Sequence, residues 1–288
     1  MGSPTRKLKH SSSRIPDPGP CQCHPRVGTK RPPGGCLPRK IMESAASDLK
    51  ISIPKSAAAL RKALEKALGV EPNQEHTFLY KLPISTDMKR RLQAEYLRPP
   101  MPTEWKSDPD TWLDSINIGD VMNQYEEVYK HFEFMGPFPI DFAAPNPYEQ
   151  NSGKCLMNEM CELRVTKARQ NGTKAIGIIY NLDPHFKSGS HWVANYIDLE
   201  KHKCYYFDSY GMAPPQQVEK FMKWLTTQDP TMELAYSSRR LQYKNTECGV
   251  YSIYFIIRML FGDSFVEFSR RKPTDADMLE LRKCLFSI

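Results

Sequence analysis

The chain has 288 residues, 40% of them hydrophobic and 11% aromatic, and a formal net charge of +7. This composition supports a substantial core and excludes a wholly disordered protein. No stretch approaches the ~20 apolar residues that cross a bilayer, and residues 250–261, the nearest to one, are interrupted by Arg258. No apolar run follows the basic N-terminus, so we expect no secretory signal and no membrane partner. In a chain of this length we expect the eight cysteines to be free thiols in a reducing compartment.

The positive charge is concentrated at the start of the chain. Residues 1–40 hold nine Lys or Arg and one acidic residue, so the rest is nearly neutral. Residues 1–47 are rich in Pro, Gly, Ser and Arg, and such a segment cannot bury enough apolar area to offset its chain entropy. We predict that residues 1–47 form a disordered basic tail, which either contacts nucleic acid non-specifically or serves as a solvated linker.

The same segment contains four potential zinc ligands, Cys21, Cys23, His24 and Cys36. Their spacing does not match the paired cysteines of known zinc sites, and no apolar residues surround them. We therefore predict no metal site.

Residues 48–104 are expected to form a small helical arm. Ser56 is a suitable N-cap, and leucines recur every four residues up to Gly69, a typical helix stop. A second helix is predicted at residues 86–97. Residues 99–109, which begin with two prolines, are interpreted as the linker to the next domain.

Residues 105–288 contain separate groups of helices and strands. An amphipathic helix is predicted at 117–132, and further helices at 215–225 and 249–261. Strands are predicted at 175–180, 191–199 and 203–209, with a weaker one at 234–242. Because the helices and strands do not alternate strictly, the pattern favours an α+β fold, with a central mixed sheet packed on a buried helix.

The strands at 191–199 and 203–209 can bring a histidine and a carboxylate together. If Glu200 and Lys201 form the turn between them, Asp208 lies opposite Val193. His191 shares a face with Val193, so Asp208 becomes its diagonal neighbour, with Cα atoms about 7–8 Å apart. This register would suit a general base and the group that orients it.

Cys248 directly precedes an apolar run, residues 249–261, that is typical of a buried helix. Backbone N–H groups and the helix dipole at such an N-terminus stabilise a thiolate, and a nearby imidazolium does the same. Alone, such a cysteine is more often a small core residue. The combination with His191 and Asp208 favours a nucleophile.

These residues resemble the signature of the Ulp1-like cysteine proteases, the clan of adenain and the SUMO proteases. The shared pattern is His191-Trp192, Asp208 seventeen residues later, and Gln242 six residues before Cys248-Gly249. Thr111-Trp112-Leu113 also resembles the family's entry to its core. The similarity covers residues 105–288 and is greatest to the polyprotein-processing proteases of large DNA viruses.

The resemblance implies a role for each matching residue. Cys248 would be the nucleophile, His191 the base and Asp208 its orienting group. Gln242, with the backbone N–H of Cys248, would form the oxyanion hole. Trp192 would cover a narrow substrate channel, and Gly249 would allow close approach of the substrate backbone. The chemistry would need no cofactor.

The resemblance also implies what the enzyme would act on. It favours an endopeptidase that cleaves after Gly-Gly-type sites in viral structural polyproteins during virion maturation, located in the virion and host cytoplasm. Two alternatives remain open: a SUMO or ubiquitin-like deconjugating protease, and an acyltransferase or inactive interaction module on the same fold. The chain's own Gly34-Gly35-Cys36 is a hypothetical self-processing site.

Overall fold

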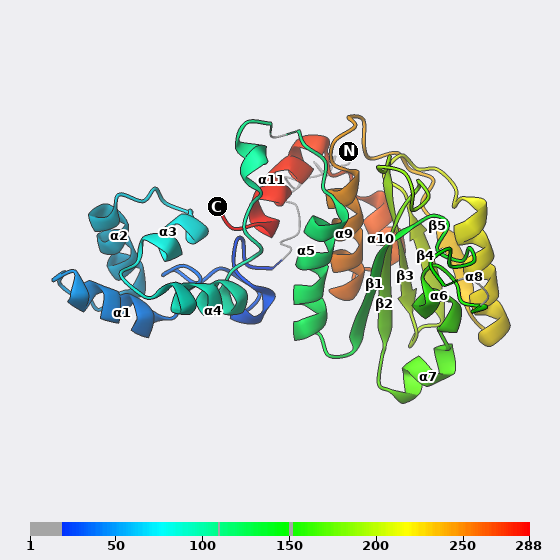
Figure 1. Ribbon diagram of the computed structural model, residues 1–288, viewed down its shortest axis with the longest axis horizontal. Coiled ribbons are helices and arrows are strands. Elements are labelled where there is room, and N and C mark those ends of the chain that lie inside the picture. Colours follow the sequence, from blue (N-terminus) through cyan, green and yellow to red (C-terminus); the bar gives the residue numbers. More distant parts are fainter. Residues whose placement is uncertain (1–18, 109, 150–151) are drawn as a thin grey trace, which may run out of the picture.

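The computed structural model describes residues 19–288 except 109, 150 and 151. It has a helical arm beside a larger α+β domain (Figure 1). The arm contains α1 (Arg39–Asp48), α2 (Ala57–Leu68), α3 (Glu75–Lys81) and α4 (Thr86–Tyr96), and a short 3-10 helix, η1 (Pro25–Val27), precedes them. The predicted α+β class is confirmed.

The larger domain is built on a five-stranded mixed sheet with strand order β1-β2-β3-β4-β5. The strands are β1 (Phe132–Pro139), β2 (Ala175–Asn181), β3 (Trp192–Asp198), β4 (Lys203–Phe207) and β5 (Glu233–Tyr236). The pairs β1–β2 and β4–β5 are parallel, and the two inner pairs are antiparallel.

Helices cover both faces of this sheet (Figure 1). On one face lie α5 (Ser115–Val128), α9 (Cys248–Leu260), α10 (Phe265–Arg270) and α11 (Asp275–Leu285); on the other lie α6 (Asn158–Glu162), α7 (Val165–Gln170) and α8 (Gln216–Gln228). Every residue of α9 except Arg258 and Leu260 is buried. This burial explains the nearly uniform apolar sequence of α9 and holds its first residue, Cys248, in one place.

Several predicted elements are confirmed to within a few residues. The clearest is α2: the Ser56 hydroxyl accepts a hydrogen bond from the Ala59 N–H at 3.4 Å, and Gly69 ends the helix in the left-handed conformation at φ 59°. Other boundaries were wrong. The helix predicted at 117–132 ends at Val128, because Phe132 begins the unpredicted strand β1. The strand predicted at 234–242 is only β5, and its residues are exposed.

The prediction of a disordered tail was wrong for residues 19–47; residues 1–18 lie outside the described residues. The segment contains η1 and most of α1. Disulfides hold it, together with the burial of Leu37, Met42, Ala45 and Ala46 in the hydrophobic core of the arm. Both glycines of the hypothetical self-processing site, Gly34 and Gly35, are buried. In this fold their peptide bonds are not accessible to an active site.

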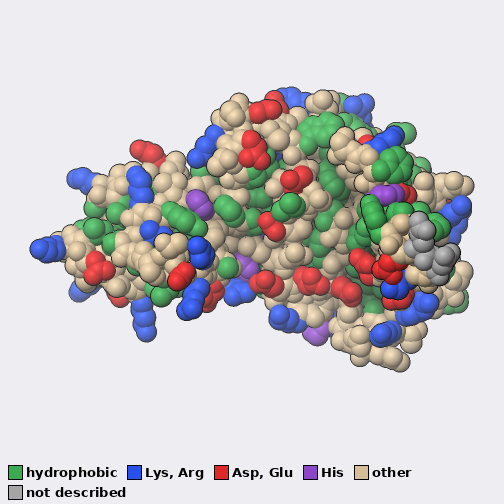
Figure 2. Space-filling model, viewed as in Figure 1, with side chains coloured by type: hydrophobic (Ala, Val, Ile, Leu, Met, Phe, Trp, Pro, Cys, Tyr) green, Lys and Arg blue, Asp and Glu red, His purple; other side chains and the backbone are tan. Residues whose placement is uncertain are grey.

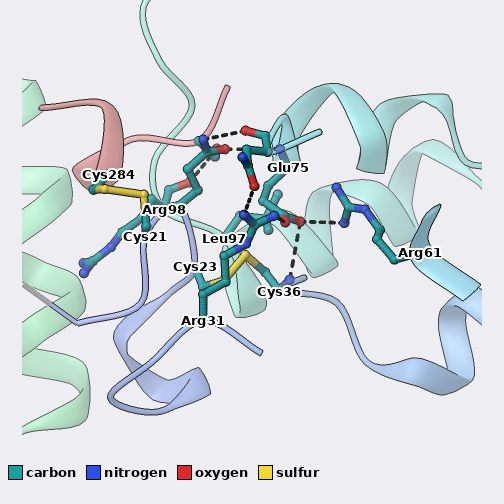
Figure 3. The surroundings of a disulfide bond; sticks show 12 residues. Cys21, Cys23, Arg31, Cys36, Arg61, Glu75, Leu97, Arg98 and Cys284 are labelled. Carbon is teal, nitrogen blue, oxygen red and sulfur yellow. Dashed lines mark hydrogen bonds and ion pairs between the residues drawn. A yellow bond between two sulfur atoms is a disulfide. The ribbon is translucent and has the colours of Figure 1, made fainter. Parts of the chain in front are cut away.

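One disulfide fastens this N-terminal segment (residues 19–38) to the larger domain, and a second closes a loop within the segment (Figure 3). Cys21 is bonded to Cys284 in α11, and Cys23 to Cys36. The backbone continues the connection, since the Gln22 N–H donates to the Cys284 carbonyl at 2.8 Å and the Arg98 N–H donates to the Gln22 carbonyl at 2.9 Å. The segment therefore lies between the arm and the larger domain.

A third disulfide joins Cys155 to Cys161, leaving Cys204 and Cys248 as the free cysteines. The prediction of eight free thiols was therefore wrong. Cys21 and Cys284 are 263 residues apart, and a separation of this size gives no local signal of pairing. Because Cys21, Cys23 and Cys36 are oxidised, their sulfurs are not available as thiolate ligands for zinc.

Within the segment interpreted as a linker, residues 99–108 pack against the end of the chain. The Met101 N–H donates to the Ser287 carbonyl at 2.9 Å. Trp105, in the 3-10 helix η2 (Thr103–Lys106), is 5% exposed and meets the Phe286 ring edge-on at 4.8 Å. The segment is thus part of the core around α11.

The cations of the N-terminal segment are not all free to bind an anionic partner. Three arginines are in ion pairs: Arg26 with Glu127, Arg31 with Glu75, and Arg39 with Glu43. Over the face of the arm seen in Figure 2, Lys and Arg side chains are interspersed with Asp and Glu. Contact with nucleic acid stays a prediction.

Candidate active site

Cys248 is the first residue of α9 and is 2% exposed. The N-terminal end of α9 lies at the same edge of the domain as the start of β3 (Figure 1). The first N–H groups of a helix have no partner within it, so a negative charge on the Cys248 sulfur would be stabilised there. The sequence predicted this position.

His191 immediately precedes β3, and Asp208 immediately follows β4. Ala194 lies opposite Phe207, and the same register puts Val193 opposite Asp208, as predicted. The Nε2 atom of His191 is 2.7 Å from Oδ1 of Asp208. Because Asp208 occupies Nε2, the other ring nitrogen, Nδ1, is left for the Cys248 thiol.

The protonation of His191 reflects opposing effects. Burial on its own would lower the pKa of the imidazole. The hydrogen bonds to Asp208 and Cys248, and the negative charges of these two groups, outweigh that effect and raise the pKa from 6.5 to about 9. At neutral pH the ring therefore carries a positive charge, which is the state that stabilises a neighbouring thiolate.

Gln242 is fully buried and is hydrogen-bonded to Ser209, the residue that follows Asp208. Its Oε1 accepts a hydrogen bond from the Ser209 hydroxyl at 2.6 Å, and its backbone N–H donates to the Ser209 carbonyl at 2.9 Å. Within the described residues, its Nε2 has no hydrogen-bond partner. A buried amide N–H₂ left without a partner is available to an incoming oxygen atom.

Trp192 and Gly249 lie against each other beside Cys248. The indole Nε1 of Trp192 donates to the Leu113 carbonyl at 2.8 Å. A Cβ added to Gly249 would be 3.1 Å from Leu113 Cβ and 3.3 Å from Trp192 Cδ1. The glycine therefore lets these two side chains pack on the start of α9, while its predicted role in substrate approach stays a prediction.

Two residues that the sequence analysis did not consider, Ser209 and Tyr210, complete the surroundings. The Tyr210 ring stacks on the His191 ring with centroids 4.7 Å apart and planes inclined by 22°. The Tyr210 N–H also donates to Asp208 Oδ1 at 2.8 Å. The signal that could have revealed them is the turn sequence Asp-Ser-Tyr-Gly at 208–211, where Gly211 has φ +75°.

The described part of the chain contains no group of three or more His, Cys, Asp or Glu side chains placed to hold a metal ion. It also contains no helix with the length and apolar character required to span a membrane.

Comparison with known proteins gives matches in the same region. The model of the Ulp1 protease family, C-terminal catalytic domain, matches residues 173–287. A protein of Acanthamoeba polyphaga mimivirus, named as a candidate thiol protease, is 34% identical over 173 residues, which are 57% of this chain and 52% of the relative. The chain thus spans about half the length of that protein.

A second relative is the SUMO-1 cysteine protease of African swine fever virus. It is 30% identical over 188 residues, which are 61% of this chain and 68% of the relative. The crystal structure of an African swine fever virus protease is similar with a TM-score of 0.62 and 20% identity, over 94% of this chain and 96% of that one. This structural similarity extends to the arm as well as the sheet.

Proposed function

The chain belongs to the Ulp1 family of cysteine proteases, and from this premise we propose that it hydrolyses peptide bonds with Cys248 as the nucleophile. The observation that carries the proposal is the convergence of three side chains: His191 is hydrogen-bonded to Asp208, and its positive charge is stabilised by Cys248, the first residue of a buried helix. A cysteine, a base and an orienting carboxylate in this order are the parts that thiol protease chemistry requires.

In the first half of the proposed reaction, the Cys248 thiolate attacks the carbonyl carbon of the scissile bond. The negative charge moves to the carbonyl oxygen, where Gln242 Nε2 and the Cys248 backbone N–H donate hydrogen bonds to it. The His191 imidazolium then gives its proton to the leaving amine as the carbon–nitrogen bond breaks. The product of this half is a thioester between Cys248 and the substrate acyl group.

In the second half, water is the nucleophile. His191, now neutral, takes a proton from the water as its oxygen attacks the thioester carbon. The carbon–sulfur bond breaks and releases a carboxylic acid. Cys248 is again a thiolate, beside the His191 imidazolium. Asp208 keeps the ring oriented through its bond to Nε2 and stabilises the positive charge in both halves.

The proposed cleavage sites follow glycines, in the manner of Gly-Gly-X. Supporting this, Cys248 is 2% exposed and the next residue, Gly249, packs against Trp192 and Leu113, so a substrate chain that reaches the sulfur can carry little side-chain bulk. Two relatives are proteins of large DNA viruses. We accordingly propose processing of viral structural polyproteins during virion maturation as the biological role.

A second candidate function is the removal of a SUMO-like modifier. The name of the African swine fever virus relative, SUMO-1 cysteine protease, favours this function. Both functions use the same catalytic residues and a Gly-Gly terminus. They differ in whether the enzyme needs the folded surface of the modifier.

The experiment that tests the proposal compares short Gly-Gly-X peptides and matched Ala-Ala-X peptides with full-length SUMO and ubiquitin activity probes. Polyprotein processing predicts cleavage of the Gly-Gly peptides only, absent in Cys248→Ala, and slow labelling by the probes. Fast labelling by a modifier probe would instead support deconjugation. Acetyl transfer from acetyl-CoA without peptide cleavage would contradict both.

For location, we propose the virion in preference to the host cytoplasm. Three disulfides are present, and disulfides persist in oxidising surroundings such as virions but are rare in the reducing cytosol. Mass spectrometry of purified particles under non-reducing conditions would detect the oxidised chain.

A further inference from the structure

The carboxamide of Gln242 has one bonded end and one unbonded end. Its oxygen accepts the 2.6 Å hydrogen bond from the Ser209 hydroxyl, whereas its nitrogen, within the described residues, has no partner although it is buried. The two ends of a carboxamide are nearly equal in size, so shape alone does not determine which end faces the reacting carbonyl. A hydrogen bond to one end of the Gln242 carboxamide is required to fix its orientation.

Ser209 is well placed to supply that contact. It is 1% exposed, and its carbonyl accepts hydrogen bonds from the N–H groups of Leu241 at 2.8 Å and Gln242 at 2.9 Å. With the hydroxyl, three hydrogen bonds join this one residue to the segment that carries the amide. Ser209 therefore anchors both the backbone and the carboxamide oxygen of Gln242.

The residues on either side of Ser209 hold the base. Asp208 binds His191 Nε2, and the Tyr210 ring stacks on the imidazole. Gly211 lies against the backbone of Arg239, where an added Cβ would be 2.7 Å from the carbonyl carbon. The turn at 208–211 thus binds both His191 and Gln242, and it fixes one relative to the other.

We propose that Ser209 is a positioning residue for the oxyanion hole: its hydroxyl holds the Gln242 oxygen so that Nε2 points at the oxyanion. This inference deepens the proposed function and rests on it. If the hydroxyl is removed, the buried Oε1 loses its partner and the carboxamide rotates to find another. The hydrogen bond from Nε2 to the oxyanion is then lost or misaligned, which weakens a contact made in the transition state and not in the ground state.

The test measures peptide cleavage by Ser209→Ala, Ser209→Thr, Gln242→Ala and the double variant Ser209→Ala/Gln242→Ala. Removing one oxyanion-hole donor lowers kcat by about 10²–10³, and we expect Ser209→Ala to approach this loss with little change in KM. Ser209→Thr keeps the hydroxyl and should recover activity. In the Gln242→Ala background, Ser209→Ala should cost nothing more, since both act through one contact.

A matched control is Ser287→Ala, which removes another buried serine hydroxyl, one that donates to the Arg98 carbonyl at 2.9 Å away from the turn at 208–211. It should leave kcat unchanged. Equal losses from Ser209→Ala in the presence and absence of Gln242, or a loss that Ser209→Thr does not restore, would contradict the proposal.

A second readout does not depend on peptide cleavage. In Cys248→Ala protein, the side-chain amide resonances of Gln242, assigned by their disappearance in Gln242→Ala, should shift and broaden when Ser209 is changed to Ala. Unchanged resonances would overturn the role of Ser209. If the wild-type enzyme cleaves no peptide but the Gln242 resonances still shift on Ser209→Ala, the proposed peptide hydrolysis is wrong, while Ser209 still anchors the Gln242 amide.

Discussion

The imidazole of His191 lies between a carboxylate, a thiol and an aromatic ring, and each neighbour affects it differently. Asp208 and Cys248 stabilise its positive charge, while Tyr210 restricts its plane. The charge and the orientation of the ring are thus set by separate residues. Substitutions can therefore change one property without the other.

The pKa of His191 predicts how activity and stability depend on pH. Folding raises this pKa from 6.5 to about 9, so the stabilisation is fully present below pH 6.5 and is lost as pH rises through about 9. Above that pH the ring is also unprotonated and cannot protonate the leaving amine. We expect kcat and the melting temperature to fall together between pH 7 and 9.5, roughly the interval set by this shift. In His191→Asn this part of the melting-temperature profile should be flat; an unchanged profile would rule out His191 as its source.

Tyr210 provides a second prediction for a single residue. Stacked ring pairs contribute about 0.5–1.5 kcal/mol, so Tyr210→Ala should lower kcat by up to about tenfold as the imidazole gains freedom. Tyr210→Phe keeps the ring and loses the 3.3 Å hydrogen bond from its hydroxyl to the Lys244 carbonyl. It should retain most activity. A Phe variant as impaired as the Ala variant would show that the hydroxyl, and not the stack, is what matters.

The two free cysteines should differ sharply in reactivity. Burial raises the pKa of the Cys204 thiol to about 12, so little thiolate forms there near neutral pH. Cys248, by contrast, interacts with the charged imidazole of His191. Iodoacetamide at pH 7 without reductant should modify Cys248 alone, as peptide mapping would reveal, and Cys248→Ala should remain unmodified. Labelling of Cys204 at a similar rate would contradict this assignment.

Among the secondary-structure elements, α11 supports the loop before the nucleophile. Arg282 of α11 and Glu247 are 3% and 2% exposed and pair at 3.0 Å. Arg282 also donates to the Thr111 carbonyl at 2.6 Å. The pair joins α11, the segment that precedes α5 and the residue next to Cys248.

Breaking this pair should destabilise the protein substantially. Arg282→Met leaves the Glu247 carboxylate buried without its cation, which typically costs about 3–5 kcal/mol. Lys283→Met is the matched control on the same helix, because the Lys283–Glu280 pair is exposed and such pairs contribute about 1 kcal/mol or less. Urea unfolding would measure both. Equal losses of unfolding free energy in the two variants would mean that Glu247 is not a buried carboxylate that depends on Arg282.

The sequence predicted the elements whose signals are local. Ser56 and Gly69 mark the ends of α2, and the turn around Glu200 determines the register that brings Asp208 to His191. Strand β1 was missed because Phe132 continues the apolar pattern of the preceding helix. The hydroxyl contact from Ser209 to Gln242 joins residues 33 positions apart, so no local pattern indicates it.

At the scale of the whole molecule, the disulfide between Cys21 and Cys284 ties the N-terminal segment to α11. In the chain-entropy model, a disulfide stabilises by restricting the unfolded chain, and it does so more when it closes a longer loop. Cys21→Ser should lower the free energy of unfolding by about 2–5 kcal/mol. Cys155→Ser, which opens a disulfide spanning 6 residues, should cost less. Equal losses in thermal or urea unfolding would argue against the entropic origin.

No sequence pattern indicated this arrangement, and the composition of the N-terminal segment was misleading. A segment poor in aliphatic residues normally stays disordered. Here Cys23 and Cys36 are joined, and Glu75 is buried against Arg61 at 2.8 Å (Figure 3). The disulfide that ties this segment to α11 joins residues 263 positions apart, so no local pattern indicated it.

The bond between Cys21 and Cys284 also makes residues 21–284 a covalent ring. A single cut opens a ring without dividing it, so a nicked molecule would run as one band on a denaturing gel until reductant is added. Gly34 and Gly35 lie inside this ring and inside the smaller loop closed by Cys23 and Cys36. A cut after Gly35 would therefore release no fragment without reduction. Without reductant, nicked and intact chains would both run as one band. Only the gel with reductant would separate the fragments of a nicked chain.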